Sequence, residues 1–244
     1  MRSISVSAFV ALAFASGLSS AEQLGDHGTF VIGVDRVFGY VSQTTSYDYT
    51  TTVPTQTGTT TTKTTHETTT SQFSFLGHYL PISVGQVPRL SFDAFVGPGI
   101  SLGGSIMYDY YSYGHKDNGV EDPDKQSTGI WLLSPRVGFG HMFTPVVGIW
   151  PRAGVTYAHE STDSPSTNVT TGVVTHTTSS TGALYYTMDV NLVVTPLPHI
   201  GFTVGPTLDY LLSQSSSQTP PATNPETNHK EHALGLQAGF FGWF

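Results

Sequence analysis

The 244-residue chain contains no cysteine, and charged residues make up only 11% of it. Without cysteine it has no disulfide framework, and ordinary soluble domains carry roughly 25% charged residues. No internal segment approaches the about 18 consecutive apolar residues that a transmembrane helix needs. The net charge of −8 argues against nucleic-acid binding, which requires a basic surface. These absences exclude a disulfide scaffold, a helical membrane protein and a nucleic-acid binder.

The chain begins with a pattern that is typical of export. Arg2 precedes an apolar run over Val6–Ala15, and small residues follow at Ser19 and Ala21. A positive start, a short apolar run and small residues before a cleavage site indicate a secretory signal peptide, and the run is too short to span a bilayer as a helix. We therefore expect residues 1–21 to be a signal peptide and residues 22–244 to form one mature domain.

The remaining chain alternates apolar and polar residues with a period of two, which is typical of β-strands with one apolar face. In the last segment the apolar residues share one face, namely Leu234, Leu236, Ala238, Phe240 and Phe244. The same alternation predicts strands over residues 29–41, 69–77, 100–110, 131–140, 147–157, 184–194 and 200–210, although the strand over 69–77 rests only on Phe73 and Phe75. Most of these strands reach the length of about ten residues that a tilted membrane-spanning strand needs.

The connections between the strands alternate in length. Short turns are expected at 143–145 and 195–199, and long polar external loops at about 42–68, 112–128, 158–181 and 213–231. Membrane barrels have short periplasmic turns and longer external loops, so both termini should lie on the periplasmic side. Residues 78–99 stand where a short turn is expected, and the sequence allows either a short helix after Pro88 or a long bent strand.

Aromatic residues gather at both ends of the predicted strands, as two membrane interfaces require. Those beside the long loops are Tyr40, Tyr108, Tyr110, Trp131, Tyr157, Tyr186 and Tyr210, and those beside the short turns are Phe30, Phe139, Phe202, Phe240 and Phe244. We expect an all-β fold, an eight-stranded antiparallel up-and-down transmembrane β-barrel. A soluble lipocalin-like barrel is the alternative, and it would carry its apolar face inside.

This pattern resembles the small eight-stranded bacterial outer-membrane β-barrels of the OmpA/OmpX type. The resemblance covers residues 29–244 and rests on architecture, without a catalytic motif. It implies a location in the bacterial cell outer membrane, contact with outer-membrane lipid, and recognition of Phe240 and Phe244 by the barrel assembly machinery as an assembly signal.

Several charged residues fall on the inner face of the predicted strands, where they would form a lumen charge network: Arg136, Arg152, Asp109, Asp189 and Asp209. Such a network is either an ion path or a structural plug. We favour the plug, because an eight-stranded barrel has room for little more than its own side chains. Asp35 and Arg36 are adjacent, so strict alternation would point one of them at lipid. We expect a β-bulge that turns both inward.

Six histidines lie in or beside the predicted loops, and the pattern His159-Glu160-Ser161 resembles the His and Ser pair of lipid A deacylases. A metal site or a catalytic serine would need a preorganised arrangement that flexible Thr-rich loops do not supply. We therefore expect no catalytic, cofactor-binding or metal-binding residues, and a structural, adhesive or surface-protective role. An outer-membrane lipid-modifying enzyme and a soluble lipocalin-like binder are the alternative functions.

Overall fold

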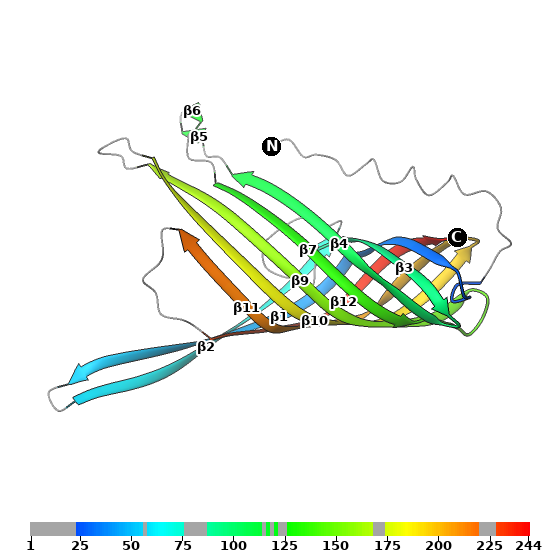
Figure 1. Ribbon diagram of the computed structural model, residues 1–244, viewed down its shortest axis with the longest axis horizontal. Helices are drawn as coiled ribbons and strands as arrows, with labels where there is room; N and C mark the ends of the chain where they lie inside the picture. The colour runs from blue at the N-terminus through cyan, green and yellow to red at the C-terminus, as the bar shows by residue number, and fades with distance from the viewer. Residues whose placement is uncertain are drawn as a thin grey trace.

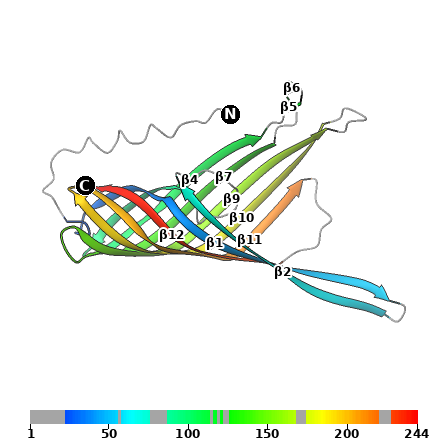
Figure 2. The same cartoon turned by 180° about the vertical axis from the view of Figure 1, so that it is seen from behind.

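A computed structural model of the chain describes residues 23–55, 58–75, 87–113, 116–117, 120–121, 126–167, 174–219 and 228–244. Eight strands, each antiparallel to both neighbours, close into a barrel (Figures 1 and 2). In order around the wall they are β1 (Phe30–Thr55), β3 (Arg89–Gly97), β4 (Ile100–Tyr113), β7 (Gln126–Phe139), β9 (Val147–Thr167), β10 (Val174–Leu197), β11 (Ile200–Thr219) and β12 (Asn228–Trp243), which pairs again with β1. The predicted fold class is confirmed. The predicted signal peptide lies outside the described residues.

The outer face of the barrel is apolar, as the alternation predicts, and the inner face is polar except near the short turns. On β12, Leu236 is 53% exposed while its neighbour Gln237 is 4% exposed. Most of the aromatic residues predicted for the two interfaces are exposed on this outer face, among them Tyr108, Trp131, Phe139 and Phe202. A soluble lipocalin-like barrel would show the reverse. None of the described residues forms a helix long and apolar enough to cross a membrane.

The second strand of the wall differs from the sequence prediction. Residues 69–75 of the expected strand lie in β2 (Gly58–Phe75), which pairs with β1 from Phe38 outward. The inner half of the wall is completed by β3, which pairs with β1 from Phe30 to Asp35. The helix considered after Pro88 is therefore wrong, and the bent strand is closer to the structure. Residues 78–86 of that segment lie outside the described residues.

Strands continue far into the segments that were expected to be external loops. β1 and β2 stay paired without a register shift from Phe38 opposite Phe75 to Thr55 opposite Gly58. We call Ser46–Thr55 together with Gly58–Glu67 the outer ribbon. β12 accompanies it only as far as Asn228, opposite Asp48. The ribbon projects beyond the other strands, at the lower left of Figure 1.

The opposite end of the barrel carries the short connections. β8 (His141–Met142) leads into a turn before β9, and Pro198–His199 joins β10 to β11. Phe30 and Phe244 exchange two backbone hydrogen bonds at this end, where the chain also ends in Figure 1. The remaining short strands, β5 (Lys116–Asp117) and β6 (Val120–Glu121), form a separate hairpin at the outer end.

An apolar cluster fills the inside of the barrel near the short turns. Its buried members are Leu24, Val31, Phe95, Trp150, Val193, Phe241 and Trp243. Leu24 belongs to a turn before β1 that is tied to the wall, because the N–H of Gly28 donates to the carbonyl of Phe95 and the N–H of Gly99 donates to that of Gly25. This cluster therefore closes the inner end of the lumen.

Candidate functional site: a buried charge layer in the barrel

Charged side chains meet inside the barrel because their strand positions share one level. In the register of the wall, Asp93 of β3 is opposite Gly103 of β4. Arg136 of β7 is opposite Gly103 on one side and Gly154 of β9 on the other. The glycines make room for the long side chains, since a Cβ at Gly103 would lie 2.5 Å from the Asp93 Oδ1 atom. Next along the wall, Asp189 of β10 is opposite Arg152 of β9.

A β-bulge adds two more charges to this layer. The register of β1 against β12 shifts between Val34 and Phe38, and Arg36 adopts a left-handed backbone with φ of 58°. Such a φ is uncommon for a residue other than glycine and needs support from its surroundings. Both Asp35 and Arg36 are buried. The predicted bulge is confirmed, and it resolves the conflict between the adjacent charges.

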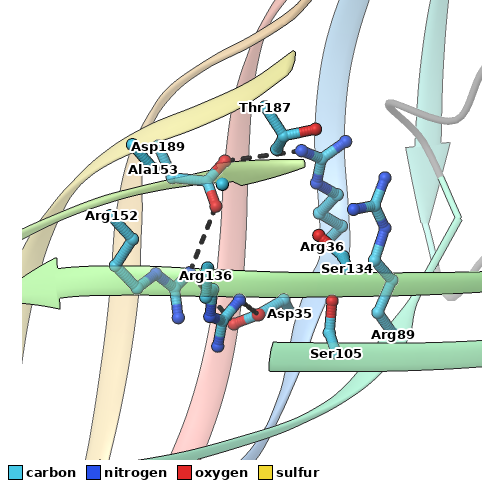
Figure 3. Close-up of a pocket in the computed structure, with 11 residues that line it drawn as sticks. Asp35, Arg36, Arg89, Ser105, Ser134, Arg136, Arg152, Ala153, Thr187 and Asp189 are labelled. Carbon is cyan, nitrogen blue, oxygen red and sulfur yellow. Dashed lines mark hydrogen bonds and ion pairs between the residues drawn. The ribbon is translucent and has the colours of Figure 1, made fainter. Parts of the chain in front are cut away.

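Ion pairs join these residues into a continuous chain of alternating sign, and Figure 3 draws its members from Arg136 to Arg36. In order, the chain runs Asp93, Arg136, Asp35, Arg152, Asp189, Arg36 and Asp209. Arg136 is held on both sides, because its Nε donates to Asp93 Oδ1 at 3.2 Å and its Nη1 donates to Asp35. At the far end, the Arg36 Nη1 atom lies 2.7 Å from Asp209 Oδ2.

Hydroxyl groups satisfy further carboxylate oxygens in the same layer. Thr187 donates to Asp209 at 2.7 Å and Thr207 donates to Asp189 at 2.8 Å. Arg89 is also buried and lines the layer beside Arg36 in Figure 3. The four buried arginines (36, 89, 136 and 152) and the four buried aspartates (35, 93, 189 and 209) balance in charge. That balance and the hydrogen bonds offset the cost of desolvating the ions.

Four of the five residues predicted for the lumen network lie in it, namely Arg136, Arg152, Asp189 and Asp209. Asp109 does not, because it is exposed on the outer part of β4 and accepts a hydrogen bond from the backbone N–H of Tyr110. Sequence reasoning missed Asp93 and Arg89, since β3 was not assigned. The one available signal was that Asp93 alternates with Phe92 and Ala94.

The charge layer borders a small cavity among the described side chains. Its volume is about 10 Å³, which is room for about one water molecule. The guanidinium of Arg152 lies 4.9 Å from the centre of the Trp150 ring, so the charge layer rests directly on the apolar cluster. This arrangement favours the structural plug over the ion path.

The His159-Ser161 pattern falls on the outer end of β9. The Nε2 atom of His159 lies 3.4 Å from the Oγ of Ser180 on β10, and its ring packs on Trp131. Within the described part of the chain, no hydrogen bond joins His159 to a carboxylate that would orient it, and nucleophilic catalysis needs such a third group. The described residues also contain no group of three His, Asp or Glu side chains that could hold a metal ion.

A closed eight-stranded barrel with an apolar exterior and a charged interior is a membrane barrel, because lipid is the solvent that accepts such an exterior. The chain is an integral membrane β-barrel protein, with the architecture of the small eight-stranded bacterial outer-membrane barrels that the sequence resembles.

No model of a known protein family matches the sequence, and no curated protein matches it. Among solved structures it is similar to the outer membrane protein OprG from Pseudomonas aeruginosa, with 10% identity over 90% of this chain and 97% of that one and a TM-score of 0.44. It is also similar to a major outer membrane protein from Thermus thermophilus, with 16% identity over 84% of this chain and 99% of that one and a TM-score of 0.42. A third similar structure is that of Ail, the attachment invasion locus protein of Yersinia pestis, with 12% identity over 88% of this chain and 99% of that one and a TM-score of 0.35. The class of the protein rests on its own barrel rather than on these likenesses.

Proposed function

We propose that this barrel is an anchor for surface display, and that the outer ribbon makes adhesive contacts outside the cell. The observation that carries this proposal is the unbroken pairing of β1 with β2 far beyond the end of β12. A hairpin of this length adds nothing to the closure of the barrel. Its sequence is almost entirely threonine and other polar residues, so it does not bury a core of its own.

The interior of the barrel supports the same proposal. A transporter or pore needs a continuous path, whereas here the charge layer and the apolar cluster fill successive levels of the lumen. Cross-strand hydrogen bonds also order the base of the hairpin, since Thr65 donates to Asp48 at 2.8 Å and Ser71 donates to Ser42 at 3.2 Å. The structure thus combines a sealed support with an ordered projecting element, which suits contact rather than transport.

The test compares cells that display the full chain with cells that display a shortened variant. In the variant an Asn-Gly turn replaces residues 46–67, because Thr45 and Thr68 are opposite each other and a two-residue turn of this type closes a hairpin. We expect the full chain to raise adherence to a layer of cultured epithelial cells, and the shortened variant to lose this gain at equal surface levels. Equal adherence of the two would refute an adhesive ribbon.

A second measurement checks the sealed lumen. The purified full chain is inserted into a planar lipid bilayer and the current is recorded in potassium chloride. We expect no steady conductance steps, because the cavity beside the charge layer has a volume of about 10 Å³ and is too small for a hydrated ion. Regular steps would contradict the anchor and favour a channel.

A further inference from the structure

Within the described part of the chain, β2 presents a long strand edge on the side away from β1. β2 extends over 18 residues and pairs with β1 on one side, while no strand of the described chain pairs with its other side. Proteins protect such edges with proline, bulges, several lysines or short strands. β2 contains no proline and a single lysine, and its register against β1 has no shift. The edge is therefore suited to the addition of another strand.

The sequence of β2 is self-complementary around Thr65. If a second β2 is placed antiparallel with Thr65 opposite Thr65, position 63, a lysine, falls opposite position 67, a glutamate, on both sides of the centre. Threonines at 60, 61 and 62 then fall opposite threonines at 70, 69 and 68. Opposite charges and paired threonines are favourable cross-strand neighbours in a sheet. A parallel in-register pair would instead place lysine opposite lysine and glutamate opposite glutamate.

We propose that the outer edge of β2 binds the same edge of a second copy of this chain, antiparallel and centred on Thr65. This inference rests on the proposed adhesive function and adds to it a further partner, a second copy of the chain. The two strands run in opposite directions, and each ribbon projects away from its own barrel. The paired barrels therefore lie at opposite ends of the joined ribbons, in two membranes that face each other. The contact links one cell to another of the same kind.

The experiment uses lipid vesicles that carry the full chain with its ribbon outward, and it measures their clustering by light scattering. Wild-type vesicles are expected to cluster. Lys63→Glu alone places glutamate opposite glutamate, and Glu67→Lys alone places lysine opposite lysine, so each should lower clustering roughly tenfold. Lys116→Glu makes the same charge change on β5, away from the ribbon, and is the matched control that should cluster like the wild type.

Mixing vesicles that carry the two single variants tests the charge pairing directly. Vesicles with Lys63→Glu mixed with vesicles with Glu67→Lys regain opposite charges at both pairs, so the mixture should cluster although neither population does so alone. The double variant Lys63→Glu/Glu67→Lys should cluster by itself. Clustering that is the same in every variant, or single variants that are not rescued on mixing, would overturn the proposed pairing.

The two proposals fail separately. If wild-type vesicles do not cluster, the pairing of two copies is overturned, while a loss of epithelial adherence in the shortened variant would leave the adhesive ribbon standing. If the shortened variant adheres as well as the full chain, the proposed adhesive function is refuted. The pairing of two copies is then still tested independently by the clustering of the charge variants.

Discussion

The pair formed by Asp93 and Arg136 is the most informative place to perturb the charge layer. Arg136 contacts both oxygens of Asp93, and Asp93 is only 1% exposed. Asp93→Leu leaves four buried arginines with three aspartates, and Arg136→Met leaves three arginines with four aspartates. The double variant restores the balance at three of each. Asp35 then still has Arg152 at 3.2 Å.

The size of the expected effect follows from the burial of the pair. Removing one partner of a buried ion pair costs about 3–5 kcal/mol, because the other charge stays buried without compensation, whereas replacing both with apolar residues is often close to neutral. We expect each single variant to lose about 3–5 kcal/mol in its free energy of unfolding, and the double variant to lose no more than about 2 kcal/mol. The coupling energy should therefore be at least about 4 kcal/mol.

The assay is urea unfolding of the barrel refolded into lipid vesicles, followed by the fluorescence of its three tryptophans and by gel mobility before and after boiling. Asp109→Leu is the control, because Asp109 is exposed outside the layer and its replacement should change stability by less than about 0.5 kcal/mol. If the losses of the two single variants simply add in the double variant, the pair is not a balanced unit and the reasoning is refuted.

Three further predictions concern other parts of the barrel. Trp150→Ala should cost about 3–5 kcal/mol in the same assay, because Trp150 is fully buried against Phe95 and Phe241 and a cavity would remain. Replacing residues 46–67 with Asn-Gly should leave the heat-dependent gel shift of the barrel unchanged, since loop closure depends weakly on length. Phe244→Asp should cost roughly 1.5–3 kcal/mol in vesicles but lower surface levels strongly in cells, and normal surface levels would argue against an assembly signal at Phe244.

The alternation of apolar and polar residues was enough to predict most of the barrel wall. On β12, Leu236 and Phe240 face outward and Gln237 faces inward, as their spacing indicates. This success has a local cause, since neighbouring residues of a strand point to opposite faces whatever the strand pairs with. The bulge at Asp35 and Arg36 was also predictable, because two adjacent charges do not fit a strict alternation in lipid.

The second strand of the wall was not predictable in the same way. The sequence predicted a strand at 69–75 and left residues 89–97 between a short helix and a bent strand. Only the pairing with β1 shows that the first segment continues into the hairpin and the second crosses the inner half of the barrel. The exposure of Asp109 has a related origin. The alternation along β4 assigns Asp109 to the inner face. Asp109 nevertheless lies on the outer part of β4, beyond Ile106, which is the last residue paired with β3.

The sequence by itself determined that this chain forms a membrane barrel with charges inside, because low charge, strand periodicity and two aromatic belts are properties of the chain read in order. The tertiary structure alone decided which charges meet. Asp93, Arg136, Asp35 and Asp209 come from four different strands, and their contacts depend on the register of each pair around the closed wall. Arg136 and Asp35 are 101 positions apart and Arg36 and Asp209 are 173 apart, so no local pattern specifies these contacts.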